Sequence, residues 1–351
     1  MDRFELRRLD YGLSEDHIAV QAAYRQFFKT HCSIETVWAA QDSGFDKSLW
    51  ERLCATGATT MALSEASGGD GATLVDLTLL AEELGNAIAP LPWIDHVCAT
   101  RLLERLGVLD EAAAVSGERI VGIDPRLVGP SGRRLIPSGA VADLVVLRDG
   151  DDIVLVSSDD QPTKVDNIGR LPMAWIDPRA ADHRVVVASG PEALASHQRA
   201  LDEWRLLTAS ALVGLVDATL NLAAEFAKSR YTLGVPISTL QGISHPLANI
   251  AIVVAGGRNL VRRAAWYLDN EPDERPELAP SAFVYMAEEA SRSATMAVHV
   301  QGGLGVSAEA ASSAYLVRAR GWPLAGGDPG ATAKYVADIV VARESRSGKG
   351  E

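Results

Sequence analysis

Two short stretches of the chain carry residue types that could hold a phosphate-bearing ligand. The first, RYTLGVPISTLQ, places Arg230 and Gln241 on either side of a Gly-Val-Pro turn. A guanidinium and a carboxamide in that arrangement suit a phosphate or an amide edge. The second, HVQGGLG, follows an Ala-rich helical run and places Gly302, Gly303 and Gly305 within four residues. Because glycines let backbone N–H groups approach a ligand without a Cβ in the way, this turn favours close backbone contact.

The elements that must position these two stretches follow from the spacing of apolar residues. The first third of the chain is helical by this criterion, and Ser14 and Thr73 stand where helix caps are expected. Helices are predicted over residues 14–32, 46–53, 73–88 and 93–106. A glycine-rich connector, ALSEASGGDGA, joins the second of these helices to the third.

The pattern changes at about Gly117, where short β-branched runs separated by Gly, Pro and Asp begin and continue to about Gly190. From Pro191 onward, apolar residues recur at alternating three and four positions, which is typical of bundle helices. A polar, Pro-rich turn at 270–280 precedes a further helix that ends at about Val300. We therefore predict an α+β fold with an N-terminal helical domain over 1–116, a small β domain over 117–190 and a C-terminal four-helix bundle over 191–351.

Composition restricts the class of protein. A chain of 351 residues with 47% hydrophobic content can bury a substantial core, and its formal charge of −13 disfavours nucleic acid as a partner. No run of about 18 apolar residues is present, so we expect no membrane span. No apolar stretch follows the N-terminal charges, so we expect no secretion signal and a cytoplasmic location. Cys32, Cys54 and Cys98 share no CxxC spacing, which favours buried free thiols over a disulfide or zinc framework.

In this order and at this separation, RYTLGVPISTLQ and HVQGGLG closely resemble the acyl-CoA dehydrogenases. That family reads R-x-x-x-G-x-P-I-x-x-x-Q in one segment and Gly-Gly-x-Gly in the next, and grips FAD with both. Five residues match the first pattern: Arg230, Gly234, Pro236, Ile237 and Gln241. Leu233 stands where an aromatic residue is usual. The resemblance spans nearly the whole chain and implies the same order of helices, β domain and bundle.

The resemblance implies a flavin-binding role for both stretches. Arg230 would pair with the pyrophosphate of an FAD bound mainly by the neighbouring subunit, with Gln241 further along the same surface. The alternative for Arg230 is a helix-end cation favoured by the helix dipole. At the glycine turn, His299 and Gln301 stand in exchanged places relative to the family. The family also lines the acyl side of its pocket with a loop like the one from Glu65 to Gly71. The alternative is that this loop only connects two helices.

The β domain lacks a motif that the family uses to hold flavin within one subunit. Flavin-binding members carry a Thr-Glu-Pro-x-x-Gly-Ser-Asp loop there, followed by a Trp-Ile-Thr segment. Here the corresponding stretch is GERIVGIDPRLVGPSGRRLIPSGAVADLVVL. Asp124 and Pro125 stand where Glu-Pro would be, but no Gly-Ser-Asp follows, and the segment before Leu135 is shorter. The resemblance therefore implies that the in-subunit half of the flavin site is degraded.

The family's reaction removes a proton α to a thioester and transfers a hydride from the β-carbon to flavin, and it needs a carboxylate base. Two positions supply that base in different branches, and they correspond here to Gly326 and Trp204. Neither residue is a carboxylate. The nearest acids are Asp328, two residues away in a loop, and Glu203, one residue away and therefore turned about 100 degrees around a helix.

Three functions stay open on these grounds. Actinobacterial lipid and steroid catabolism includes α2β2 acyl-CoA dehydrogenases, in which a catalytic and a non-catalytic subunit hold flavin at their mixed interface. This chain resembles the non-catalytic subunit, which predicts FAD shared with a homologous catalytic partner and an acyl-CoA as substrate. The alternatives are a self-sufficient homo-oligomeric acyl-CoA dehydrogenase that uses Asp328 as its base, and a non-enzymatic scaffold.

Overall fold

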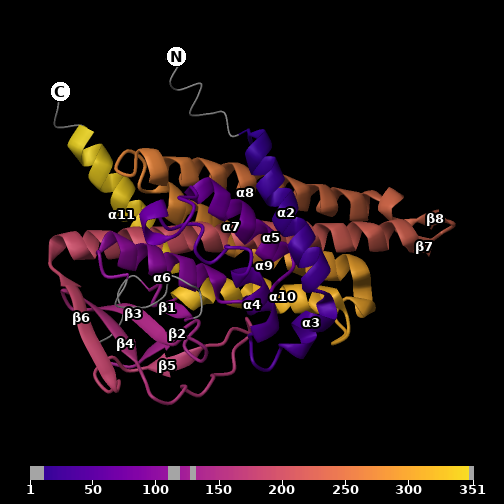
Figure 1. The fold of residues 1–351 in the computed structure, drawn as a ribbon. Coiled ribbons are helices and arrows are strands. Elements are labelled where there is room, and N and C mark those ends of the chain that lie inside the picture. The colour runs from indigo at the N-terminus through magenta and orange to yellow at the C-terminus, as the bar shows by residue number, and fades with distance from the viewer. Residues whose placement is uncertain (1–11, 110–118, 127–131, 348–351) are drawn as a thin grey trace.

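A computed structural model of the chain describes residues 12–109, 119–126 and 132–347. Helices form most of the molecule, and a small β region lies at one side of a long helical body (Figure 1). The predicted fold, with N-terminal helices, a small β region and C-terminal helices, is confirmed. The predicted boundary near Gly117 lies outside the described residues.

The N-terminal helices begin where the sequence offers capping side chains. They are α2 (Glu15–His31), α3 (Ile34–Ala39), α4 (Lys47–Cys54), α5 (Leu74–Asn86) and α6 (Trp93–Arg105), with a 3-10 turn, η1 (Glu65–Ser67), before α5. Ser14 and Thr73 each accept a hydrogen bond from a backbone N–H and complete a capping box. The four predicted helices are confirmed to within two residues at each end, and α3 is an additional short helix.

The described residues of the β region form two small sheets. The larger has the strand order β1-β3-β4-β6 and consists of β1 (Val121–Ile123), β3 (Leu144–Asp149), β4 (Asp152–Ser157) and β6 (His183–Ser189). Strand β1 runs parallel to β3, and the other pairs are antiparallel. The smaller sheet pairs β2 (Arg134–Ile136) with β5 (Ala174–Ile176). At Gly190, φ is +86°, and this glycine leads directly into the next helix.

The C-terminal half is built around α7 (Pro191–Ser229), a helix of 39 residues that runs along most of the molecule (Figure 1). The other helices are α8 (Gln241–Asn270), α9 (Leu278–Gln301), α10 (Ala311–Gly321) and α11 (Pro329–Ser347). Four short elements connect them: a hairpin of β7 (Tyr231–Thr232) and β8 (Val235–Pro236), then η3 (Ile237–Thr239), η4 (Gly302–Leu304) and η5 (Trp322–Gly326). α7 packs against α5, α8 and α9, while α10 and α11 pack against α9.

Two glycines let α5 and α7 touch backbone to backbone. A Cβ added to Gly85 of α5 would overlap the backbone of Ala211 in α7. A Cβ added to Gly214 of α7 would overlap the backbone of Glu82 in α5. Because this contact needs residues without side chains on both helices, it ties the N-terminal helices to the bundle within one continuous core.

By length and composition α7 could cross a membrane, with a mean hydropathy of 1.6 over its most apolar window. Of that window, 78% is buried inside the protein. The apolar side chains of α7 face α5, α8 and α9, and a helix that is apolar all round is typical of a core position. α7 is therefore the central core helix of this fold.

Candidate functional site

Arg230 lies where α7 ends, at the base of the β7–β8 hairpin. Its backbone N–H donates to Phe226 O at 2.9 Å, and its own carbonyl accepts from Ile237 N at 2.8 Å. These two bonds fix the backbone, while the side chain is exposed. Among the described residues, no acceptor pairs with the guanidinium. Arg230 is therefore held at a defined place with its charge free to meet a ligand from outside the subunit.

The hairpin beside Arg230 is formed by a two-residue turn. Leu233 has φ of +49° and Gly234 has φ of +80°, as a type I′ turn requires. Leu233 is 91% exposed, so the residue that departs from the family pattern stands at the tip with its side chain in solvent. Gln241 begins α8 on the other side of the turn and is also exposed. The predicted pair, Arg230 and Gln241, thus flanks a projecting hairpin.

The glycine turn that follows α9 divides into an open and a packed part. Gly302 has φ of +62°, and a Cβ on Gly302 or Gly303 would meet no atom within 4 Å. A Cβ on Gly305 would lie 2.7 Å from Val298 O, so this glycine is required by the fold itself. His299 is exposed and Gln301 is half-buried. Gly302 and Gly303 are therefore the two positions at which a ligand could approach the backbone.

The hairpin and the glycine turn lie toward the same end of the bundle (Figure 1). Large apolar side chains are exposed on both segments: Tyr231, Leu233, Val235, Leu304 and Val306. We call these two segments the exposed end of the bundle. An arginine, two open glycines and uncovered apolar side chains on one end are typical of a surface completed by another molecule.

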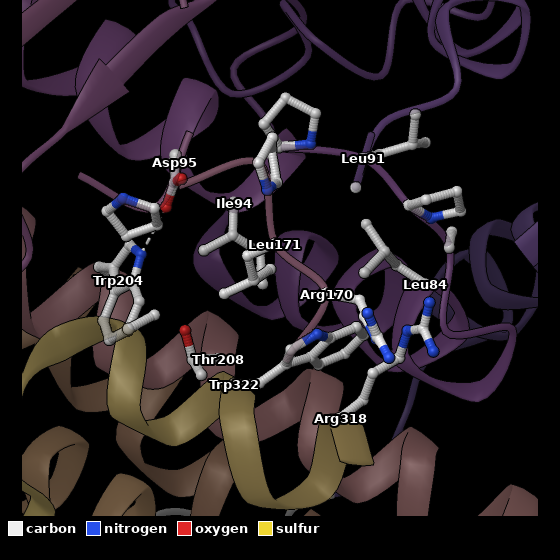
Figure 2. A pocket seen from close by; sticks show the side chains of 17 residues that line it. Leu84, Leu91, Ile94, Asp95, Arg170, Leu171, Trp204, Thr208, Arg318 and Trp322 are labelled. Carbon is white, nitrogen blue, oxygen red and sulfur yellow. Dashed lines mark hydrogen bonds between the residues drawn. The ribbon is translucent and has the colours of Figure 1, made fainter. Parts of the chain in front are cut away.

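A separate, partly open cavity of about 60 Å³ lies between α6, α7, α10 and the segment before β5. Its walls are mainly apolar, as the side chains of Leu84, Ile94 and Leu171 in Figure 2 illustrate. Polar groups stand at its two ends. Asp95 and Trp204 lie at one end, and two arginines, Arg170 and Arg318, lie at the other (Figure 2).

The two positions at which the family carries a base meet at the first end of this cavity. A Cβ on Gly326 would lie 2.7 Å from Cζ3 of Trp204, so the indole fills the space that a longer side chain at 326 would need. Trp204 Nε1 donates to Oδ1 of Asp95 at 2.8 Å. The indole therefore occupies the region that the family resemblance assigns to the carboxylate base.

Glu203, the neighbour of Trp204, is fully buried in an ion-pair cluster away from the cavity. Its carboxylate accepts from Arg105 at 2.8 Å, Arg101 at 3.2 Å and Arg199 at 3.4 Å. Burial alone would raise the pKa of Glu203, but the charges of Arg101 and Arg105 outweigh it and hold the pKa at about 2. Glu203 is thus committed to structural ion pairs, which gives no support to a role as proton acceptor.

Asp328 and the Glu65 to Gly71 loop also lie apart from the cavity. Asp328 is exposed, and its Oδ1 accepts from Gly330 N at 2.9 Å where α11 begins. The loop forms the turn η1, and Ser64 just before it donates to the carboxylate of Glu104 at 2.8 Å. Neither segment contributes a described residue to the cavity wall.

Asp95 is a buried acid that the sequence analysis did not single out. Burial raises its pKa to about 6, and the hydrogen bond from Trp204 limits the rise. The sequence does show an acid among the apolar residues at the start of a helix, in PWIDH, but its partner Trp204 is distant in the chain.

Asp124 stands at the place of the family's Glu-Pro. It is buried and is bound by Arg126 at 2.8 Å and Arg134 at 3.2 Å.

All three cysteines are free. Cys32 and Cys98 are buried as predicted, whereas Cys54 is only half-buried at the end of α4. Burial raises the pKa of each thiol, to about 12 for Cys32. Within the described residues, no group of three or more His, Cys, Asp or Glu side chains could hold a metal ion.

Comparisons with known proteins give the family. Residues 14–109 match the model of the acyl-CoA dehydrogenase N-terminal domain, and residues 194–340 match that of the C-terminal domain. The acyl-CoA dehydrogenase IpdE2 of Mycobacterium tuberculosis is 28% identical over 283 residues, which cover 80% of this chain and 83% of IpdE2.

Two solved structures share the fold. The ChsE4–ChsE5 complex from Mycobacterium tuberculosis has a chain with a TM-score of 0.83 and 23% identity, covering 95% of this chain and 99% of its own. The Tcur3481–Tcur3483 steroid ACAD G363A variant has a TM-score of 0.84 and 23% identity, covering 94% and 99%. With both family models matched and the fold shared along its length, this chain belongs to the acyl-CoA dehydrogenase family.

Proposed function

We propose that this chain is the non-catalytic subunit of a heteromeric, FAD-dependent acyl-CoA dehydrogenase and completes the flavin site of a catalytic partner. The proposal rests on the difference between two parts of the molecule, the surface that would reach flavin and the position of the catalytic base. The residues that would reach flavin, Arg230, Gln241, Gly302 and Gly303, are exposed at the end of the bundle. The place for a catalytic base, in contrast, is filled by the indole of Trp204.

The two halves of a flavin site fit this chain differently. No group in the described part of the chain pairs with the Arg230 guanidinium, and the space beside Gly302 and Gly303 is open. The half that would hold a partner's FAD therefore suits a pyrophosphate and a close backbone contact. In the half that would hold FAD within the subunit, Asp124 is already bound by Arg126 and Arg134. FAD would supply the hydride acceptor, and this chain would supply contacts to its phosphate and adenine side.

Assembly with a homologous partner accounts for the apolar side chains at the exposed end of the bundle. Tyr231, Leu233 and Leu304 are too large and too exposed to be favourable in water without a covering surface. The ChsE4–ChsE5 structure, whose chain shares this fold, is a complex of two named subunits. By analogy with that complex and with the steroid ACAD, we propose an acyl-CoA substrate of lipid or steroid catabolism, held mainly by the partner in the cytoplasm.

Substitution of Arg230 in the co-expressed complex tests this proposal. Arg230→Ala should weaken FAD binding by roughly 2–5 kcal/mol, the range for truncating one member of a buried charge pair, while the subunits stay associated. Arg230→Lys should restore only part of the affinity, because an ammonium cannot make a two-pronged contact with phosphate. The matched control is Lys228→Ala, since Lys228 is a nearby exposed cation that pairs with Glu225 within its own helix.

Flavin absorbance per mole of complex is the readout. If Arg230 is only a helix-end cation, Arg230→Ala should change stability by about 1 kcal/mol or less and leave the flavin content equal to that of Lys228→Ala. Unchanged flavin in Arg230→Ala would remove this chain from the cofactor site.

A further inference from the structure

One end of this cavity carries two arginines that are not paired with any carboxylate of the described residues. Arg318 on α10 is 3% exposed, and Arg170 is half-buried in the segment before β5. Figure 2 shows the two guanidinium groups side by side at the cavity wall, beyond the ring of Trp322. The described residues offer the side chain of Arg318 one acceptor, the backbone O of Ala314 at 3.2 Å.

The electrostatics of this pair are unfavourable as they stand. Burial, and after it the positive charge of Arg170, lowers the pKa of Arg318 to about 10. The groups that oppose this shift are Cys32 and Tyr315. Burial raises the pKa of both side chains to about 12, so both are neutral at pH 7. Two positive charges therefore lie together at this end of the cavity, and no described carboxylate forms an ion pair with either of them; the acid on the cavity wall, Asp95, lies at the other end, beside Trp204.

The backbone of Arg170 is fixed in a conformation that few non-glycine residues adopt. Its φ is +55°, and its N–H donates to Asn167 O at 3.2 Å. The side chain of Asn167 in turn bonds both backbone groups of Leu171, at 2.8 and 3.0 Å. Gly44 packs against this turn, since a Cβ there would lie 2.7 Å from Arg170 O. The neighbours thus hold Arg170 at the cavity at some cost in backbone strain.

The C-terminal end of α5 is one source of negative charge beside this end of the cavity. Tyr315 Oη donates to Asn86 O, the last carbonyl of α5, at 2.7 Å, and Leu84 lines the cavity. The end of a helix carries about half a negative charge, which offsets only part of two full positive charges. The two guanidinium groups are therefore only partly compensated by this helix end, which favours the binding of an anion beside them.

We propose that this end of the cavity binds a small organic carboxylate, whose two oxygens are held by Arg170 and Arg318 and whose apolar part lies against Leu84, Leu91 and Trp322. A guanidinium pair matches a carboxylate in geometry and charge. A cavity of about 60 Å³ has room for about four to six water-sized groups, which is the size of a carboxylate with a short alkyl tail. Inorganic phosphate would leave the apolar walls uncovered. This site does not depend on the proposed function.

The test measures ligand binding to the full-length chain by thermal unfolding and titration calorimetry. The probes are sodium butyrate, its neutral isostere butyramide, and inorganic phosphate. The variants are Arg170→Gln and Arg318→Gln. Arg320→Gln is the matched control, because Arg320 lies on the same helix as Arg318 but is exposed and bonds Thr295 at 3.3 Å.

Butyrate should raise the unfolding temperature of the wild type and of Arg320→Gln in a concentration-dependent way, and butyramide should not. Arg170→Gln and Arg318→Gln should bind butyrate roughly 10- to 100-fold more weakly, the loss expected for hydrogen bonds to a charged group. Without ligand, neither variant should unfold at a lower temperature than the control, because each substitution removes a repulsion.

Three results would overturn the proposal: equal effects of butyrate and butyramide, stabilisation by phosphate but not by butyrate, or unchanged butyrate affinity in Arg170→Gln. Because Arg170 is half-buried and lies outside the helices, its variant decides the question even if Arg318→Gln does not fold. The measurement needs no flavin, so its outcome is independent of the shared cofactor site.

Discussion

Replacing Glu203 with Gln distinguishes a structural ion-pair partner from a proton acceptor. Glu203 is fully buried and is bound by Arg101, Arg105 and Arg199. A glutamine keeps the shape of the side chain but removes the charge that compensates these three cations. The two partners on α6, Arg101 and Arg105, are themselves mostly buried and would lose the carboxylate that binds them.

The size of the effect follows from the pKa of Glu203, which the arginines hold at about 2 against an ordinary 4.5. A shift of that size corresponds to about 3 kcal/mol of stability at neutral pH. Breaking a buried ion pair by removing one partner typically costs about 3–5 kcal/mol. We therefore expect Glu203→Gln to lower the free energy of unfolding by about 3–5 kcal/mol at pH 7.

Urea unfolding followed by tryptophan fluorescence is the assay, with Glu225→Gln as the matched control. Glu225 lies on the same helix and pairs with Lys228 at 2.6 Å, but both side chains are exposed, so its loss should cost at most about 1 kcal/mol. Because the folded pKa of Glu203 is depressed, its contribution is complete above pH 4.5 and is lost as the pH falls toward 2. The difference between wild type and Glu203→Gln should shrink over that window.

An opposite pattern would refute this interpretation. If Glu203→Gln were as stable as Glu225→Gln while dehydrogenation by the complex fell by orders of magnitude, Glu203 would be a proton acceptor and the ion-pair cluster would not explain its burial.

Three further substitutions probe the exposed end of the bundle and the cavity. Gly303→Ala meets open space, so it should leave stability within about 0.5 kcal/mol, yet flavin absorbance of the complex should fall if a ligand approaches that backbone. Gly326→Ala should cost about 1–3 kcal/mol in urea unfolding, because its Cβ would lie 2.7 Å from Trp204, and an unchanged midpoint would contradict the packing. Burial raises the pKa of Asp95 from 3.8 to about 6. The free energy of unfolding of the wild type, relative to that of Asp95→Asn, should therefore fall by up to about 3 kcal/mol as the pH rises from 3.8 to 6. If this stability difference does not change with pH, the pKa of Asp95 lies at its ordinary value.

The elements of the fold were predictable because their signals are local. Ser14 and Thr73 cap helices within a single turn, and Gly190 marks a backbone conformation that separates the β region from α7. Single strands in the β region are harder to place: β5 is three residues long and alternates buried with exposed positions around Trp175, too short a run for a periodic signal.

The cavity was not predictable, because its features arise from contacts between distant segments. Asp95 meets Trp204 across α6 and α7, and Arg170 meets Arg318 across the β region and α10. Each of these residues is ordinary in its own stretch of sequence. The family pattern predicts that Gly326 and Trp204 stand at the base positions, which stays a prediction, and the structure adds that the Trp204 ring packs against Gly326.

Co-purification with the catalytic partner, followed by an absorbance scan and a subunit count, tests the central claim most directly. The claim is that the exposed Arg230, Gly302 and Gly303 complete a flavin site that this chain does not form alone. We predict that the chain purified alone is colourless and that the complex carries about one flavin per pair of unlike subunits, the ratio implied by one shared site at each mixed interface. Stoichiometric flavin and acyl-CoA dehydrogenation by the chain alone would contradict it.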